Sequence, residues 1–84
     1  MASSLHSGKY QIFREMIVKI RKDADITQVQ LAKELSKPQS YISKIENGER
    51  RIDLTEFIEI ASILKIDTQK FIKTYQKKAK GIIK

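Results

Sequence analysis

The amino-acid sequence predicts an all-α fold, a compact domain of five helices. Apolar residues recur at steps of three and four in five segments of the chain, which is the spacing of amphipathic helices. Residue pairs typical of helix N-termini stand before two of these segments. Sustained alternation of apolar and polar residues, the pattern of a half-buried strand, occurs nowhere in the sequence. A chain of 84 residues has room for one modest core, so one domain is expected.

The first helix is expected over residues 9–22. Asp25 is expected to end this helix, because aspartate tolerates the left-handed backbone region better than most residues. Its apolar face comprises Phe13, Met16, Ile17 and Ile20. The second helix is expected over about residues 28–36, after a Thr-x-x-Gln capping box formed by Thr27 and Gln30. The apolar positions of the second helix are Leu31, Ala32 and Leu35.

The third helix, residues 38–46, opens with the only proline of the chain. Pro38 fits the first turn of a helix, where no hydrogen bond needs the missing amide hydrogen. We expect Ile42 and Ile45 to face inward, and Asn47 with Gly48 to end the helix.

The last two helices each follow an acidic cap. Asp53 and Glu56 form a capping pair before the fourth helix, and Asp67 is a cap for the fifth. The apolar positions of the fourth helix are Leu54, Phe57, Ile58, Ala61 and Leu64, and those of the fifth are Phe71, Ile72 and Tyr75.

Composition argues against an enzyme, a cofactor and a metal site. The chain contains no cysteine, so disulfides, thiolate zinc sites and cysteine nucleophiles are excluded, and a reducing cytoplasm is the natural compartment. Its one histidine, His6, has no second histidine to complete a metal site. Three glycines allow neither a Walker loop nor a dinucleotide fingerprint. No apolar run exceeds three residues, so neither a membrane span nor a secretion signal is expected.

The net charge of +7 is unevenly distributed along the chain. Residues 1–69 hold eleven basic and ten acidic side chains, whereas residues 70–84 hold six lysines and no acid. The basic excess therefore belongs largely to the C-terminal end, and a nucleic-acid function must rest on motif and geometry. We accordingly divide the chain into a flexible polar leader (residues 1–8), a domain (9–75) and a basic tail (76–84).

The most informative segment spans residues 27–51. Two short helices, TQVQLAKELS and PQSYISKIE, are separated only by Lys37, which is the layout of a helix-turn-helix. Ala32 suits a close crossing of the two helices, which leaves room for little more than a methyl group.

From about Phe13 to Leu64 the sequence resembles the phage-repressor and Cro-like (XRE-type) helix-turn-helix family. The shared pattern is TQ, then LA, then a Q-S opening to the recognition helix, then I-E-N-G, in order and spacing. This resemblance implies a lambda-repressor-like DNA-binding domain. One departure is Ser36, where the family usually carries glycine. Serine fits if its backbone avoids the left-handed region or tolerates it at a small cost.

The resemblance implies specific roles for residues in and around the motif. The residues implied in contacts to base edges are Gln39, Ser40, Ser43 and Lys44. Glutamine can pair with adenine, lysine can donate to guanine and serine can reach either, so the chemistry agrees. The residues implied in phosphate contacts are Thr27, Gln28, Tyr41, Asn47, Arg50 and Arg51. Arg21 and Glu46 match a partly buried ion pair with a structural role.

Plainer interpretations accompany several of these residues. Asp53 and Glu56 are explained by capping alone, whereas Gln28 serves both DNA and the helix start. Polar residues on a helix face are solvated in an arbitrary domain, but the matched motif favours DNA contact for Gln39, Ser40 and Lys44 as a set. Tyr41 is either a phosphate-contacting hydroxyl or a neutral surface ring. Arg50 and Arg51 suit either a phosphate or the adjacent minor groove.

The lysine-rich end is open to three interpretations: solubilising charge, nonspecific attraction to DNA, or a membrane-surface helix. The last is the weakest, because the apolar face is short and tryptophan is absent. The same helix also suits dimer packing, for which Ile66, Ile72 and Tyr75 are the candidates.

We therefore expect a cytoplasmic, sequence-specific transcriptional regulator, a repressor in a bacterial or phage setting. It would bind a near-palindromic operator on double-stranded DNA as a homodimer, with residues 38–46 of each copy in the major groove and the two copies roughly 34 Å apart. The alternative is an antitoxin- or coactivator-like adaptor on the same fold, whose main partner is an unidentified protein.

Overall fold

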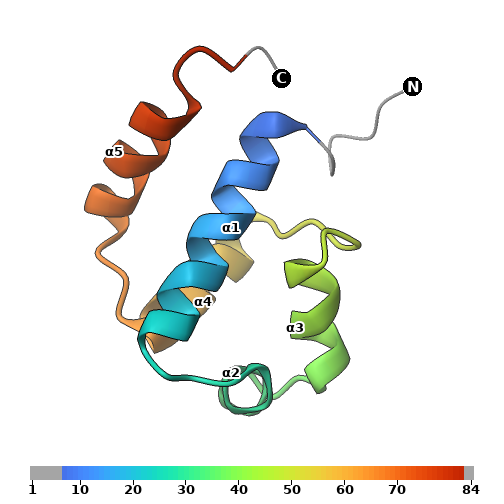
Figure 1. Ribbon diagram of the computed structural model, residues 1–84. Helices are drawn as coiled ribbons and strands as arrows, with labels where there is room; N and C mark the ends of the chain where they lie inside the picture. Colours follow the sequence, from blue (N-terminus) through green and yellow to red (C-terminus); the bar gives the residue numbers. More distant parts are fainter. Residues whose placement is uncertain (1–6, 83–84) are drawn as a thin grey trace.

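The computed structural model describes residues 7–82, and this part of the chain forms five α-helices and no strand. The helices are α1 (Gly8–Asp23), α2 (Gln28–Glu34), α3 (Gln39–Glu46), α4 (Leu54–Leu64) and α5 (Thr68–Ala79). α1 runs through the middle of the fold, with α5 along one side and α3 on the other (Figure 1). The same view shows α4 behind α1, and α2 beyond the C-terminal end of α1. The predicted all-α architecture of five helices is confirmed.

Each helix begins where the sequence offers a cap or a proline. The capping box of Thr27 and Gln30 has both of its hydrogen bonds, at 2.8 and 3.0 Å. The box of Asp53 and Glu56 is also complete, which confirms the predicted pair. The predicted cap at Asp67 is confirmed too, since its side chain accepts from the backbone N–H of residue 70 at 3.1 Å. These side-chain oxygens satisfy amide donors that have no partner within the first turn.

The ends of the chain differ from the expected division in detail. Ser7 caps α1 and Gly8 begins it, although both residues were expected in the leader. α5 extends to Ala79, inside the segment expected to be the tail. The remainder of the expected leader, including His6, and residues 83–84 lie outside the described residues.

Two helix boundaries around the turn differ from the prediction. α2 ends at Glu34 rather than at Ser36, because Ser36 adopts φ 57° and closes the helix. The backbone N–H groups of Ser36 and Lys37 then donate to carbonyls of the last turn at 3.0 and 2.9 Å, which is a Schellman motif. Pro38 is the N-cap of α3 and does not lie in its first turn, since ψ is 156° there and the helix starts at Gln39.

Ser36 thus tolerates the left-handed region instead of avoiding it. Asp25, which was expected to stop α1, has φ 58°, and Gly48, expected to stop α3, has φ 78°. Lys65 ends α4 in the same conformation at φ 58°, and no feature of the sequence singled it out. Each of the five helices is therefore ended or followed by a residue at positive φ, since Gly81 after α5 has φ 90°, and two of these five residues are glycine.

Ser36→Gly is expected to raise the free energy of unfolding by about 0.5–1 kcal/mol. The left-handed conformation costs a residue with a Cβ atom roughly 1–2 kcal/mol, and the greater freedom of glycine in the unfolded chain offsets about half of that gain. Urea unfolding of both proteins measures the difference. Ser62→Gly, an exposed position inside α4, is the matched control and should lower stability by about 0.5 kcal/mol. A loss of stability in both variants would contradict the prediction.

The core gathers apolar residues of all five helices. Its buried members are Ile17, Leu31, Ala32, Ile42, Ile45, Ile52, Phe57, Ile60, Ala61, Leu64 and Phe71. Ala32 is 1% exposed in the unit formed by α2 and α3, as the predicted close crossing requires. Phe13, Phe57 and Phe71 form a cluster with ring centroids 5.0–5.9 Å apart.

Part of the expected apolar face of α4 is not buried. Leu54 is 72% exposed and Ile58 is 48% exposed, so these two apolar positions of the predicted helix do not lie in the core. Ile60, which was not expected there, is 1% exposed. Ile60 lies two residues after Ile58, and a rotation of about 200° separates these positions on a helix. The direction from which α1 and α2 approach α4 therefore decides which side is covered.

Candidate nucleic-acid interface

α2 and α3 form a helix-turn-helix in which α3 presents a polar side to solvent. Ile42 and Ile45 are buried against the core, as predicted, and this anchors the opposite side of α3. Gln39, Ser40 and Lys44 are exposed, whereas Ser43 is only half-buried. Three of the four residues expected to contact base edges therefore share an accessible surface on one short helix. In Figure 1 this helix lies at the outer edge of the fold.

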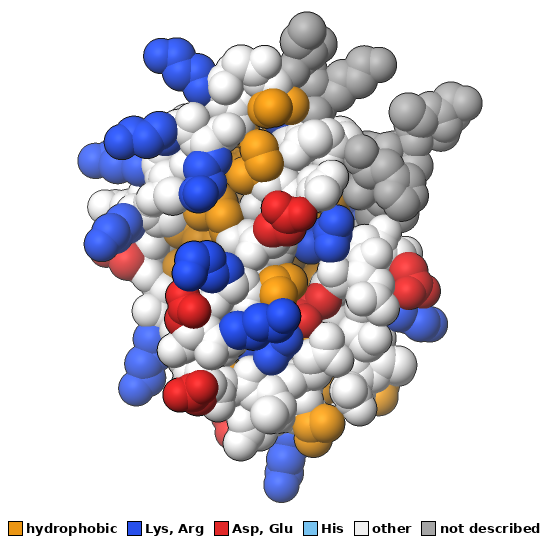
Figure 2. All heavy atoms as spheres, viewed as in Figure 1, with side chains coloured by type: hydrophobic (Ala, Val, Ile, Leu, Met, Phe, Trp, Pro, Cys, Tyr) orange, Lys and Arg blue, Asp and Glu red, His pale blue; other side chains and the backbone are white. Residues whose placement is uncertain are grey.

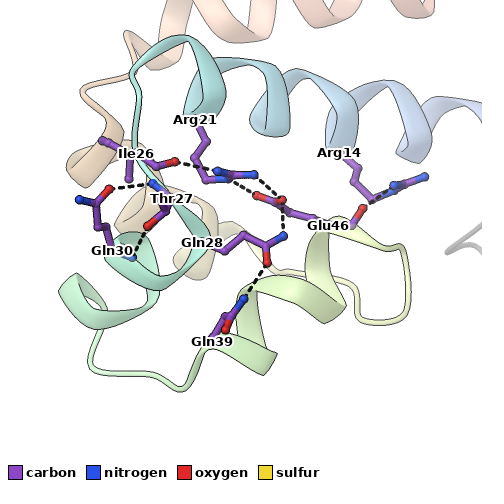
Figure 3. A network of polar contacts seen from close by, with 8 residues as sticks. All are labelled: Arg14, Arg21, Ile26, Thr27, Gln28, Gln30, Gln39 and Glu46. Carbon is purple, nitrogen blue, oxygen red and sulfur yellow. Dashed lines mark hydrogen bonds and ion pairs between the residues drawn. The ribbon is translucent and has the colours of Figure 1, made fainter.

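A buried ion pair ties this helix to α1. Arg21 Nε and Nη2 lie 2.6 and 2.9 Å from the two carboxylate oxygens of Glu46, so the contact is bidentate. Their side chains are only 9% and 7% exposed. Arg21 Nη1 also donates to the Ile26 carbonyl at 2.7 Å. The pair holds the end of α3 against α1 and the start of the helix-turn-helix (Figure 3).

Gln28 extends this network to the exposed side of α3. Its Nε2 donates to Glu46 Oε1 at 2.8 Å, and its Oε1 accepts from Gln39 Nε2 at 3.3 Å. Figure 3 shows the resulting chain from Arg21 through Glu46 and Gln28 to Gln39. Residues spread over three helices thus orient the amide of Gln39, and this leaves Gln39 Oε1 facing outward as an acceptor.

Arg14 is a contributor that sequence reasoning missed. Its Nη1 donates to the backbone carbonyl of Glu46 at 2.6 Å, at the C-terminal end of α3, where carbonyls lack helical partners. A positive charge is favourable there because it opposes the helix dipole. The one available signal was spacing, since Arg14 precedes Arg21 by seven residues and so lies on the same side of α1. Gly48 packs beside it, with a Cβ position 3.4 Å from Arg14 Cζ.

A second cluster of interacting side chains, formed by Lys37, Tyr41, Arg50 and Glu56, flanks α3. Tyr41 Oη donates to Glu56 Oε2 at 3.0 Å, and Arg50 Nη2 donates to the same oxygen at 2.8 Å. Arg50 also stacks on the Tyr41 ring, 4.8 Å from its centroid, and Lys37 Nζ lies 5.1 Å from that centroid. The cluster fixes Arg50 beside the polar side of α3. Glu56 therefore does more than the capping that the sequence indicated.

This cluster shifts three pKa values. Hydrogen bonds from Arg50, then from the backbone N–H of Asp53, lower the pKa of Glu56 from 4.5 to about 2. Burial, then the hydrogen bond to Glu56, raises the pKa of Tyr41 to about 12. The hydrogen bond to Glu56 raises the pKa of Arg50. Tyr41 is therefore neutral and Arg50 and Glu56 are charged at neutral pH, so the phenol keeps its hydrogen and donates it to the Glu56 carboxylate.

The depressed pKa of Glu56 predicts an acid-dependent contribution to stability. Ionised Glu56 stabilises the fold fully above pH about 4.5, and this contribution is lost as the pH falls towards about 2. Arg50 is partly exposed, and solvent therefore screens its pair with Glu56. We expect the pair to contribute about 1 kcal/mol to the free energy of unfolding, which corresponds to several degrees in Tm. Glu56→Gln should be less stable than the unmodified chain at pH 6 and equally stable near pH 2, by thermal unfolding.

Glu59→Gln is the matched control for this titration, because Glu59 is exposed on the same helix. The difference in Tm between Glu59→Gln and the unmodified chain should stay small throughout the pH range. If the difference in Tm between Glu56→Gln and the unmodified chain were the same at pH 6 and pH 2, ionisation of Glu56 would not contribute to stability, and the prediction would be contradicted.

The remaining residues expected to contact phosphates have varied surroundings. The Thr27 hydroxyl accepts a hydrogen bond within its capping box. Asn47 is exposed at the end of α3, and its Nδ2 lies 3.4 Å from Ser43 Oγ. Arg51 turns away from Arg50 and stacks on Tyr10 of α1, with Cζ 4.5 Å from the ring centroid. The two adjacent arginines therefore lie against different elements.

The three residues expected at a dimer interface do not share one surface. Ile66 lines a groove between α1 and α5. Ile72 and Tyr75 line a different hollow of about 200 Å³, next to Leu54. Any single apolar interface on α5 can therefore include Ile72 and Tyr75 without Ile66.

Fold and site together define a helix-turn-helix DNA-binding protein. Residues 17–71, well over half of the chain, match the family model described as Helix-turn-helix. The chain belongs to this family, of the XRE and Cro-like type, and the resemblance seen in the sequence is confirmed. None of the curated proteins compared with the chain matches it. The protein is thus a DNA-binding transcription regulator of the XRE type.

Two further findings concern residues 7–82 alone. No helix in this range is both long and apolar enough to span a membrane. The same range contains no group of three or more His, Cys, Asp and Glu side chains placed to hold a metal ion.

Proposed function

We propose that the protein is a non-enzymatic, cytoplasmic repressor that binds a near-palindromic operator as a homodimer, with α3 in the major groove. One observation carries the proposal. Gln39, Ser40 and Lys44 are exposed on the short helix α3, and the chain from Arg21 to Gln28 fixes the orientation of Gln39. Base recognition requires such preset donors and acceptors, because an adaptable side chain discriminates poorly between base edges. A protein seated at a promoter excludes polymerase without further contacts.

The proposed base contacts follow from the chemistry of each side chain. Gln39, with its Oε1 free and its Nε2 shared with Gln28, suits the N6 and N7 edge of adenine. Lys44 donates to guanine O6 or N7, and Ser40 to either kind of base. Ser43 is half-buried and contributes only at the rim of this surface.

The proposed phosphate contacts surround this surface. They comprise Thr27, Gln28, Tyr41, Asn47, Arg50 and Arg51. Tyr41 contributes through its ring, because its hydroxyl hydrogen is held by Glu56. The guanidinium of Arg50 stacked on that ring is the group that reaches the DNA backbone. Such contacts position the helix without reading sequence.

We propose the α4–α5 side of the domain as the dimer interface. Leu54, Ile58 and Ile72 are 72%, 48% and 49% exposed, and Tyr75 lines the hollow beside Leu54 and Ile72. Exposed apolar side chains gathered on one side of a small domain are typical of an association surface. A dimer that reads a near-palindromic operator requires its two copies of α3 to lie roughly 34 Å apart, one turn of DNA.

Selection of duplexes from a random pool by the full chain tests the proposal. We expect an enriched sequence with two-fold symmetry and a binding stoichiometry of two chains per duplex. The logarithm of affinity should fall linearly with the logarithm of salt, with a slope of about −5 to −9 for six to ten phosphate contacts. An adaptor that binds only protein would enrich no sequence and show no such slope, and that result would replace the proposal by the alternative function.

A further inference from the structure

The side of the molecule opposite α3 carries a groove between α1 and α5, here called the α1–α5 groove. It encloses about 440 Å³, and its floor is formed by Met16, Ile20, Ile66 and Phe71. Phe71 is buried, and the other three are half-buried. The floor is therefore apolar, and part of it remains in contact with water.

Four lysines and one acid, Asp67, form the rim of the groove, and the Asp67 carboxylate accepts a hydrogen bond from the backbone N–H of residue 70 as the cap of α5. Lys19 stands on the α1 side, Lys65 at the end that joins α4 to α5, and Lys70 and Lys78 along α5. All four are exposed, and within residues 7–82 only Lys19 has an ion-pair partner, Asp23 at 2.9 Å. Figure 2 shows the apolar strip between α1 and α5 with Lys and Arg side chains along its outer edge. An apolar floor inside a cationic rim selects a ligand that is both apolar and acidic.

The lining of the groove has the geometry that accepts a helix. Lys70, Thr74 and Lys78 follow one another at steps of four along α5, and Met16 and Ile20 do so along α1. Rows at this spacing are the ridges between which a row of side chains from a third helix packs. The row from Lys70 to Lys78 is about 12 Å long, which corresponds to roughly two turns.

We propose that the α1–α5 groove binds an acidic amphipathic helix of a partner protein. Leucine-like residues of that helix would cover Met16, Ile20 and Ile66, and flanking carboxylates would face the rim lysines. A second copy of this chain is a poor occupant, because the strongly basic end of the chain would approach an already cationic rim. DNA would leave the apolar floor uncovered.

The position of the groove separates it from the DNA-reading surface. α1 lies between α5 and α3, so a helix in the groove does not cover Gln39 or Lys44 (Figure 1). The partner can therefore bind while α3 is on DNA. The proposal does not rest on the repressor role and can be tested without DNA.

Fluorescence anisotropy with three labelled 15-residue peptides tests the inference on the full chain. The first has leucines at helical spacing flanked by glutamates, the second replaces its glutamates by lysines, and the third replaces its leucines by alanines. Only the first should bind at micromolar concentration, and backbone amide shifts on its addition should centre on Met16, Ile20, Ile66 and Phe71. Binding of the second or third peptide with equal affinity, or no binding of the first below 1 mM, would overturn the proposal.

Two double variants of α5 separate the groove from general charge. Lys70→Glu with Lys78→Glu should weaken binding of the first peptide about tenfold, since two rim charges are reversed. Lys73→Glu with Lys77→Glu changes the same helix by the same charge, but neither residue lines the groove, and affinity should change less than threefold. If both double variants weakened binding of the first peptide equally, the peptide would be attracted by the charge of α5 alone and the groove proposal would fail. Self-association of the chain through Met16, Ile20 and Ile66, or tighter binding of dodecanoate than of the first peptide at these residues, would likewise count against the proposal.

Discussion

Glu46→Ala is expected to lower the free energy of unfolding by about 3–5 kcal/mol. The substitution leaves the guanidinium of Arg21, whose side chain is 9% exposed, buried without its carboxylate. It also removes the acceptor of the Gln28 amide. A small domain has a total stability of only about 5–15 kcal/mol, so the variant should unfold at much lower urea concentration. Chemical unfolding monitored by circular dichroism measures the loss.

An exposed ion pair on α1, the helix that carries Arg21, provides the control. Lys19 and Asp23 are joined at 2.9 Å, but their side chains are 75% and 65% exposed. Asp23→Ala should therefore cost less than about 1 kcal/mol. Replacing Arg21 and Glu46 together by methionine should recover most of the stability lost in Glu46→Ala, because no unpaired buried charge remains. A Glu46→Ala variant as stable as Asp23→Ala would contradict a structural role for the buried pair.

Replacing Gln39 and Lys44 together by alanine is expected to abolish preference for the selected operator. Each side chain is expected to discriminate its base by about 1–3 kcal/mol, so together they contribute about 2–6 kcal/mol of specificity. Nonspecific affinity should fall far less, since only the positive charge of Lys44 is lost from the electrostatic attraction. Competition between the operator and a shuffled duplex, measured at a fixed salt concentration, gives the ratio of the two affinities directly.

Gln69→Ala with Lys73→Ala is the matched control for this double variant. Both positions are exposed on α5, and the substitutions remove the same types of side chain. The ratio of operator to shuffled affinity should be unchanged in this control. Unchanged sequence preference in the Gln39 and Lys44 variant would refute the assignment of α3 as the recognition helix, whatever its effect on total affinity.

Local sequence signals located most of the fold. The capping boxes at Thr27 and Asp53 fixed where α2 and α4 begin, because they depend on hydrogen bonds between residues three apart. The turn was harder to place. Ser36 could adopt or avoid the left-handed region, and only the packing of α2 against α3 made it adopt φ 57°.

The candidate site was predictable as a set of residues but not as a network. Sequence order identified the polar residues of α3 and the pairing of Arg21 with Glu46. It did not show that Gln28 connects Glu46 to Gln39, or that Arg14 reaches the end of α3. Each of these contacts joins residues from different helices, and their distances depend on how those helices cross.

The sequence by itself determined the five helices, the caps at Thr27, Asp53 and Asp67 and the order of the helix-turn-helix, since these depend on spacings within one or two turns. Only the tertiary structure decided which apolar residues are covered and which basic residues act together. Ile66 and Ile72 are neighbours in sequence, one just before α5 and one within it, but they line different surfaces in space. The six lysines after residue 69 form one basic run in the sequence, yet the packing of α5 on α1 directs Lys70 and Lys78 to the α1–α5 groove and leaves Lys73 and Lys77 outside its lining. Helix periodicity gives the direction of each side chain around its own axis, and packing alone sets what that direction faces.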